Sequence, residues 1–388
     1  MALKEQLFRM IDNHIFVYAS EPGGVDALIP VIDILKCKFN VCVFGTDKLA
    51  NRYENYGLEC NDLEEILADI SVDSLTYLFR KIKPVCVLTG TGATNMYERM
   101  MWEAARRCCI QSFALVDNSV NYSIRFSDKT LADISALEKH LPNTLTLPDY
   151  IFAIDDFCRN EMVGEGLPAD RILTFGQPFY YRVVQGVRSL DYEDVMEYRA
   201  KQGCTNGKKL ILYAPDQILN NGESTNNISY IGYNEYTVLK CITLAIDEID
   251  PTHNSLFLMA RPHPSDSNYF WNEVECNGEV GVPRCLTSSI ELAIASADVV
   301  IGMYSSFLVM AFLAGKKVIS AQIGLNREQP SVLCRKGLIK CASSMDELIV
   351  QLEAVLYGAV YKNNICENKI DNPAKEISKF IEKRIGKN

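Results

Sequence analysis

The chain has 388 residues, a formal net charge of −10 and 48% hydrophobic residues. This length fits two α/β domains better than one core, and the composition is that of a globular protein. The acidic charge argues against non-specific nucleic-acid binding, which needs a basic surface, and no apolar run approaches the roughly twenty residues that cross a bilayer.

The fourteen cysteines lie mostly inside apolar segments. No pair has CxxC spacing and no Cys/His cluster has the spacing of zinc ligands, so we expect reduced thiols and no metal site. The first residues include Glu5, Arg9 and Asp12, where a signal peptide would need an apolar core. Together these features predict a cytoplasmic protein.

In the first half, short apolar runs alternate with amphipathic stretches of helical period, which is typical of a parallel sheet with crossover helices. Strands are predicted at residues 14–20, 40–45, 84–90, 111–117, 149–155 and 171–178. Helices are predicted at residues 25–35, 62–70, 74–82 and 95–108, and Glu21–Gly24 is predicted to form the first turn.

A polar segment at residues 186–208 predicts a linker with a short helix. A second series follows, with strands at 209–215, 255–264, 298–302 and 316–321 and helices at 233–249, 289–297, 306–314, 345–357 and 373–385. We therefore expect an α/β protein of two Rossmann-like, doubly wound domains facing a central cleft. The predicted domains are residues 1–185 and 186–388.

Ligands of open parallel sheets bind beyond the carboxyl ends of the strands, and glycine-rich turns follow two predicted strands of the first half. Gly23 and Gly24 follow the first strand, where they form either a binding loop or a plain turn. The segment Thr89–Thr94 follows the third, and Thr91 and Glu98 are candidates for substrate contact there. The alternative is a simple turn with Thr94 as a helix N-cap.

Asp117 ends the predicted strand 111–117 and is followed by Asn121 and Arg125. A partly desolvated carboxylate at a strand end is a natural general base, because desolvation raises its pKa towards neutrality. The alternative interpretation is that Asp117 caps the next turn or pairs with Arg125.

In the second half, Arg261-Pro262-His263-Pro264 follows a predicted strand, and the prolines should fix the direction of His263. Arg261 and His263 are donors that can hold a phosphate and balance leaving-group charge. Ser305 and Ser306 precede a helix whose free N–H groups suit an anion, although Ser306 can equally be a plain N-cap.

With these motifs, the chain resembles the GT-B glycosyltransferase superfamily, the class that also contains the UDP-GlcNAc 2-epimerases. The resemblance rests on EPGG after the first strand, FGQPF near the domain crossover, RPHP, and the segment SADVVIGMYSSFLVMAFLAGKKVIS. Bacterial sialyltransferases of this fold have an acidic motif followed by HP and SS motifs. These fall here on Asp117, on His263-Pro264 and on Ser305-Ser306.

The resemblance implies a metal-independent glycosyltransferase with an N-terminal acceptor domain and a C-terminal donor domain. Asp117 and His263 are the implied catalytic residues, and a nucleotide-sugar, such as a CMP-linked acidic sugar, is a substrate and not a cofactor. The acidic motif departs from the usual two acidic residues and a glycine, since it reads Val116-Asp117-Asn118-Ser119. Met310 stands where UDP-using relatives have a ribose-binding glutamate.

Two other functions remain open, a nucleotide-sugar 2-epimerase or hydrolase of the same fold, and a non-catalytic nucleotide-sugar-binding protein. The implied partners are a nucleotide-sugar donor and a glycan or lipid-linked acceptor, with no nucleic acid. The Lys-rich tail from Lys379 to Lys387 either contacts a membrane surface or is a solvated helix end. The sequence leaves the oligomeric state open, a homodimer included.

Overall fold

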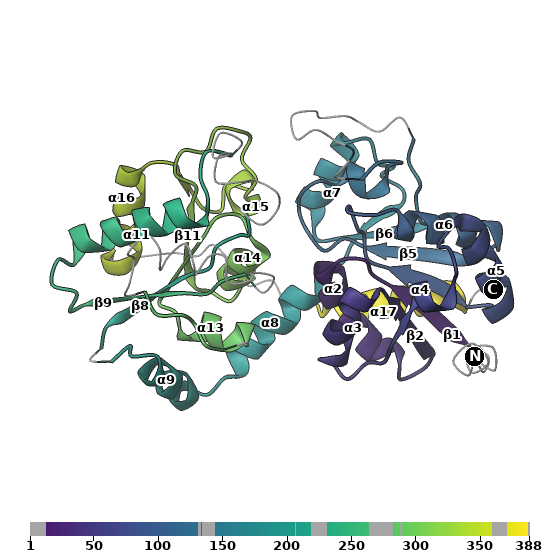
Figure 1. Cartoon of the computed structure of the whole chain (residues 1–388), viewed down its shortest axis with the longest axis horizontal. Coiled ribbons are helices and arrows are strands. Elements are labelled where there is room, and N and C mark those ends of the chain that lie inside the picture. Colours follow the sequence, from purple (N-terminus) through teal and green to yellow (C-terminus); the bar gives the residue numbers. More distant parts are fainter. Residues whose placement is uncertain are drawn as a thin grey trace. The chain divides into compact units, whose positions relative to one another are not determined.

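The computed structural model describes residues 13–130, 133, 144–205, 207–218, 231–263, 282–287, 289–358 and 371–386. The chain divides into two compact units (Figure 1). The first contains Met1–Tyr181 and Lys369–Asn388, and the second contains Arg182–Asn368.

The first unit is built on a seven-stranded parallel sheet in the order β3-β2-β1-β4-β5-β6-β7. Every residue of β1 is buried, as expected for a strand with helices on both faces. The strands are β1 (His14–Tyr18), β2 (Asn40–Gly45), β3 (Cys60–Asp62), β4 (Cys86–Thr89), β5 (Gln111–Leu115), β6 (Tyr150–Ala153) and β7 (Ile172–Thr174).

Helices cover both faces of this first sheet, and local signals set several of their ends. Ser71 and Ser74 form a capping box at the start of one, and the Asp155 side chain caps another. The helices are α2 (Pro22–Leu35), α3 (Asp47–Glu54), α4 (Leu63–Ile66), α5 (Val72–Ile82), α6 (Tyr97–Arg107), the 3₁₀ turn η1 (Ser123–Phe126), α7 (Asp156–Gly164), α17 (Pro373–Ile385) and α8 (Pro178–Ser189), which runs on into the second unit.

The second unit is built on a five-stranded parallel sheet in the order β12-β11-β10-β8-β9. Its strands are β8 (Lys209–Tyr213), β9 (Leu256–Ala260), β10 (Val299–Gly302), β11 (Lys317–Ala321) and β12 (Cys341–Ala342). Its helices are α9 (Tyr192–Lys201), α11 (Glu235–Ile249), α13 (Ile290–Ser296), α14 (Ser306–Leu313), α15 (Val332–Arg335) and α16 (Met345–Tyr357).

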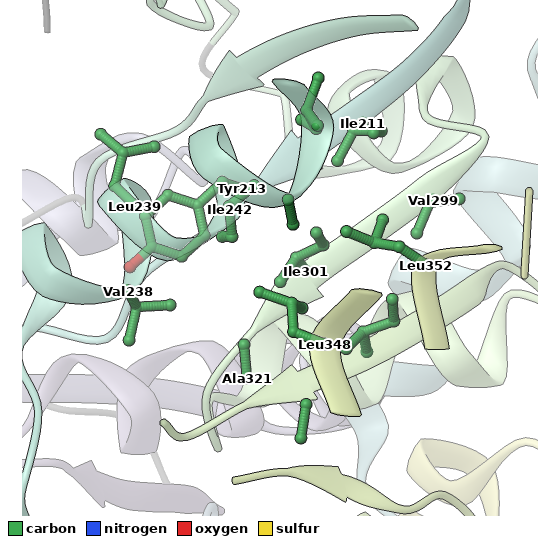
Figure 2. Close-up of a cluster of buried hydrophobic side chains, with 14 of the residues drawn as sticks. Ile211, Tyr213, Val238, Leu239, Ile242, Val299, Ile301, Ala321, Leu348 and Leu352 are labelled. Atoms are coloured by element: carbon green, nitrogen blue, oxygen red, sulfur yellow. The ribbon is translucent and has the colours of Figure 1, made fainter. Parts of the chain in front are cut away.

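One face of the second sheet carries a large apolar core beneath α11 and α16 (Figure 2). Ile211 and Tyr213 of β8 and Ile301 of β10 point into it, and Ile242 and Leu348 meet them from the two helices. Burial of these branched and aromatic side chains is the main driving force for docking the helices. The core therefore fixes the strand ends from which the loops of this unit extend.

The predicted α/β class with two Rossmann-like sheets is confirmed. The predicted turn Glu21–Gly24 is instead the start of α2, because Pro22 occupies the first helical turn, where its fixed φ and missing N–H are tolerated. Among the described residues, no helix is long and apolar enough to cross a membrane.

The last helix differs from the expected division into residues 1–185 and 186–388. Helix α17 packs beside α2 of the first unit, with Ile377 and Ile381 buried (Figure 1). Phe380 makes edge contacts with Phe113 of β5 and Tyr150 of β6. The apolar face of α17 thus completes the first unit.

In the Lys-rich tail, Lys379 forms a surface pair with Glu376 at 2.7 Å, and Lys387 lies outside the described residues.

Candidate functional site

The loops after β1 and β4 meet at the point where the strand order of the first sheet reverses. β1 has β2 on one side and β4 on the other, so the crossover after β1 runs in one direction along the sheet and the crossover after β4 runs in the other. Such a switch point opens a crevice at the carboxyl ends of the strands, where open α/β sheets bind ligands. The predicted residues Gly23, Gly24 and Thr91 all follow these two strands.

Glycines allow the start of α2 and the loop after β4 to approach each other closely. A Cβ on Gly24 would lie 3.5 Å from the Cα of Gly90, and one on Gly90 would lie 3.2 Å from the Cα of Gly24. The Glu21 carboxylate joins the loops by accepting hydrogen bonds from the backbone N–H groups of Ala93 (2.8 Å) and Thr94 (2.9 Å). Glu21 was not singled out from the sequence as a site residue. Its hydrogen bonds hold the N-terminus of α2 against the loop after β4 and so fix the backbone at the switch point.

Glu98 lies beneath these loops. It is 1% exposed, and its Oε1 accepts hydrogen bonds from the Ser20 N–H (2.9 Å) and hydroxyl (2.6 Å). Burial raises the pKa of this carboxyl, and the hydrogen bonds from Ser20 oppose the rise. A Cβ on Gly92 would lie 2.0 Å from the Ser20 Oγ and 3.0 Å from both Glu98 oxygens. The structure therefore shows Glu98 supporting the loops, and substrate contact by it stays a prediction.

Asp117 and Arg125 form a nearly buried ion pair at the carboxyl end of β5. The Arg125 Nη1 donates to the Asp117 Oδ1 at 2.8 Å, and the two side chains are 5% and 11% exposed. Arg125 also donates to the backbone oxygen and hydroxyl of Thr91, which links the loops after β4 and β5. Burial raises the pKa of Asp117, and Arg125 opposes the rise. The pairing that the sequence left as an alternative is present.

Asn121 is exposed and has a φ of 55°, a left-handed conformation that asparagine tolerates better than most residues. It forms part of the turn before η1. Its predicted role in substrate binding stays a prediction.

Gly23 lies against the Asp117 carboxylate. A Cβ on Gly23 would lie 2.2 Å from the Asp117 Oδ2, too close without movement of the carboxylate. We expect Gly23→Ala to destabilise the first unit by about 1–3 kcal/mol, although alanine is normally the better helix former. Thermal unfolding measures this. Gly164→Ala at the end of α7 is the matched control, since nothing lies within 4 Å of its added Cβ. An equal effect of the two substitutions would contradict the close approach.

The second sheet reverses its strand order at β8, which has β9 on one side and β10 on the other. Asp216 follows β8 and is 9% exposed. Its Oδ2 accepts a hydrogen bond from the Tyr304 N–H at 2.9 Å, and the N–H groups of Met303 and Ser305 also point to this carboxylate. Asp216 was not singled out from the sequence, although its place three residues past a buried strand is the same signal that marked Asp117.

The predicted serines lie where the loop after β10 enters α14, and Ser306 is the first residue of that helix. Ser305 is the N-cap residue of α14, but its side chain makes no capping hydrogen bond, and Ser306 is exposed. Below the loop, the Ser320 hydroxyl donates to the Met303 oxygen at 2.5 Å, and the Gln322 amide donates to the Ser320 hydroxyl at 2.8 Å. The loop is therefore held from below while its serines lie at the start of a helix.

Arg261 and His263 follow β9. The Arg261 guanidinium lies 5.7 Å from the ring centre of Phe307 in α14 and donates to the Thr287 oxygen. The structure thus brings Arg261 to the first turn of α14, and its predicted role in holding a phosphate stays a prediction. His263 is exposed, and Pro264 lies outside the described residues. Within the described part of the chain, no group of three or more His, Cys, Asp or Glu residues has the arrangement of a metal site.

No protein-family model matches this sequence, and no curated protein matches it significantly. The structure is similar to UDP-GlcNAc 2-epimerase from Neisseria meningitidis bound to UDP-GlcNAc, with 18% identity, TM-score 0.63 and coverage of 97% of this chain and 100% of the other. A putative UDP-N-acetylglucosamine 2-epimerase from Listeria monocytogenes has 14% identity, TM-score 0.65 and coverage of 97% and 98%.

A glycosyltransferase from Rickettsia africae has 11% identity, TM-score 0.56 and coverage of 97% and 100%. At such low identity these similarities establish the fold. The described residues have the two-unit, Rossmann-like GT-B fold.

Proposed function

We propose that this chain is a metal-independent glycosyltransferase that moves a sugar from a nucleotide donor to a surface-glycan acceptor. The observation that carries the proposal is the Asp117 carboxylate, at the end of β5, paired with Arg125 at 2.8 Å and raised in pKa by burial. Such a carboxylate is suited to remove the proton of an acceptor hydroxyl as that oxygen attacks the sugar. Arg125 would keep the base ionised and correctly directed.

The second unit would hold the donor. The start of α14 offers backbone N–H groups to a phosphate, and Arg261 lies beside the Phe307 ring in the first turn of that helix. His263, two residues further on, would balance the charge of the departing nucleotide. A CMP-linked acidic sugar is the donor that the HP and SS motifs favour. This assignment needs no metal ion or cofactor.

UDP-GlcNAc 2-epimerase activity is the second candidate, because epimerases predominate among the similar structures. Met310 of α14 favours the transferase instead, since the resemblance predicts a ribose-binding glutamate at this place in UDP-using relatives. The Met310 side chain is 3% exposed and contributes no hydrogen bond of that kind. Incubation with UDP-GlcNAc separates the candidates, since formation of its 2-epimer would support the epimerase.

The first test is a thermal-shift panel of CMP, UDP, GDP, CDP and ADP on the wild type and on His263→Ala. A nucleotide at a hundred times its dissociation constant should stabilise the protein by about 2.7 kcal/mol. We expect one nucleotide to do so, and the shift to shrink in His263→Ala. His253→Ala is the matched control, because His253 is an exposed histidine of the same unit that faces Asp247. The absence of any shift would contradict the donor site.

A further inference from the structure

The Asp216 carboxylate is bound to the loop that would receive the donor phosphate. Its Oδ2 accepts from the Tyr304 N–H at 2.9 Å, and the N–H groups of Met303 and Ser305 also point to it. Ser305 is the N-cap residue of α14, so the loop that holds Asp216 leads directly into that helix. A negative charge is thus already held beside the proposed phosphate position.

The titratable and charged side chains around Asp216 do not neutralise the negative charge of its carboxylate. Glu235, in the first turn of α11, adds a second carboxylate, which is itself held by the Ile218 N–H at 2.9 Å. Tyr213 of β8 and Tyr233 before α11 are the other titratable groups that interact with it, and Arg327 is the cation near Tyr233. Burial, opposed by the three backbone N–H groups, raises the pKa of Asp216 to about 7.

A phosphate at the start of α14 would repel an ionised Asp216 in this poorly solvated region, where charges interact more strongly than in water. The protonated carboxyl would remove the repulsion, and its carbonyl oxygen would still accept from the loop. We propose that a phosphate-bearing ligand binds the Gly302–Ser306 loop together with one proton, which Asp216 takes up. This inference rests on the proposed function and adds a pH-dependent positioning residue to its donor site.

The experiment is isothermal titration calorimetry with UDP-GlcNAc and with CMP-N-acetylneuraminate between pH 5.5 and pH 9. The phosphates of these probes do not titrate in this range, so proton uptake reports on the protein. The Asp117→Asn background slows turnover, and no acceptor is added. Two buffers of different ionisation enthalpy at each pH give the number of protons bound. We expect uptake to approach one at pH 8 and to vanish at pH 5.5, and Kd to rise about tenfold per pH unit above neutrality.

Asp216→Asn should abolish the proton uptake and make Kd independent of pH, because asparagine does not titrate. Asp250→Asn is the matched control. Asp250 also accepts backbone N–H groups, from Ser255 and Leu256, but its pKa is lowered, so this variant should keep the uptake.

Binding without proton uptake in the Asp117→Asn protein would overturn the inference while leaving the proposed function in place, and this result needs no substitution at Asp216. Uptake that persists in Asp216→Asn would overturn it as well. Failure of both probes to bind at any pH, together with no shift from any nucleotide of the thermal-shift panel, would overturn the proposed function and this inference with it.

Discussion

Asp117→Asn is expected to slow sugar transfer by about a hundred- to ten-thousand-fold while nucleotide binding stays unchanged. Asparagine keeps the size of the side chain and can still accept from Arg125, but it cannot take the proton of an acceptor hydroxyl. Because burial raises the pKa of Asp117, the wild-type rate should increase with pH as this carboxyl ionises. The variant should lose that increase.

The measurement is release of the nucleotide from the donor that the thermal-shift panel identifies, in the presence of acceptor. Asp149→Asn is the matched control, because Asp149 is a carboxylate of the first unit that lies at the opposite end of the strands and accepts hydrogen bonds from the Ser112 N–H and hydroxyl. A variant at Asp117 with near-normal transfer would exclude this residue as the base.

Arg125→Met is expected to destabilise the first unit by about 3–5 kcal/mol. Methionine fills similar space, but Asp117 would remain buried without its cation, and the Thr91 oxygen would lose a donor. Breaking a buried pair from one side is costly, since the remaining charge must be hydrated or neutralised. The loss should be smaller at low pH, where Asp117 is protonated in both proteins.

Scanning calorimetry measures this effect, with a fall of about 2–4 °C in Tm for each kcal/mol. Arg107→Met is the matched control, since Arg107 pairs with Glu103 and Asp73 on the surface and is 44% exposed. Exposed pairs contribute about 0–1 kcal/mol, so this variant should unfold nearly as the wild type does. Similar losses in the two variants would mean that burial of the Asp117–Arg125 pair does not matter.

The strands were predictable because both sheets bury them on two faces, which leaves continuous apolar runs such as Ile15–Tyr18. Helices with a narrow apolar face were harder to predict. α3 buries Leu49 and Tyr53 among polar residues, and α7 buries Cys158 and Met162. Two apolar residues four positions apart are too weak a signal in a polar segment.

The candidate site was predictable where its residues follow a strand, and much less so where they interact over long distances in the sequence. Asp117 and Arg125 are eight residues apart, and their pairing was one of the two interpretations open from the sequence. Glu98 and Ser20 are 78 residues apart, and Asp216 and Tyr304 are 88 apart. Only the crossovers of the folded chain bring such residues together, so spacing in the sequence does not reveal them.

The position of α17 has a consequence for how this protein can be divided. The second unit is an insertion within the first, because the chain leaves the first unit after Tyr181 and returns to it at Lys369. A fragment cut at residue 185 would lack the helix that covers α2, and its apolar surface would be exposed to solvent. A self-sufficient first unit therefore requires both segments, rejoined by a short linker in place of the second unit.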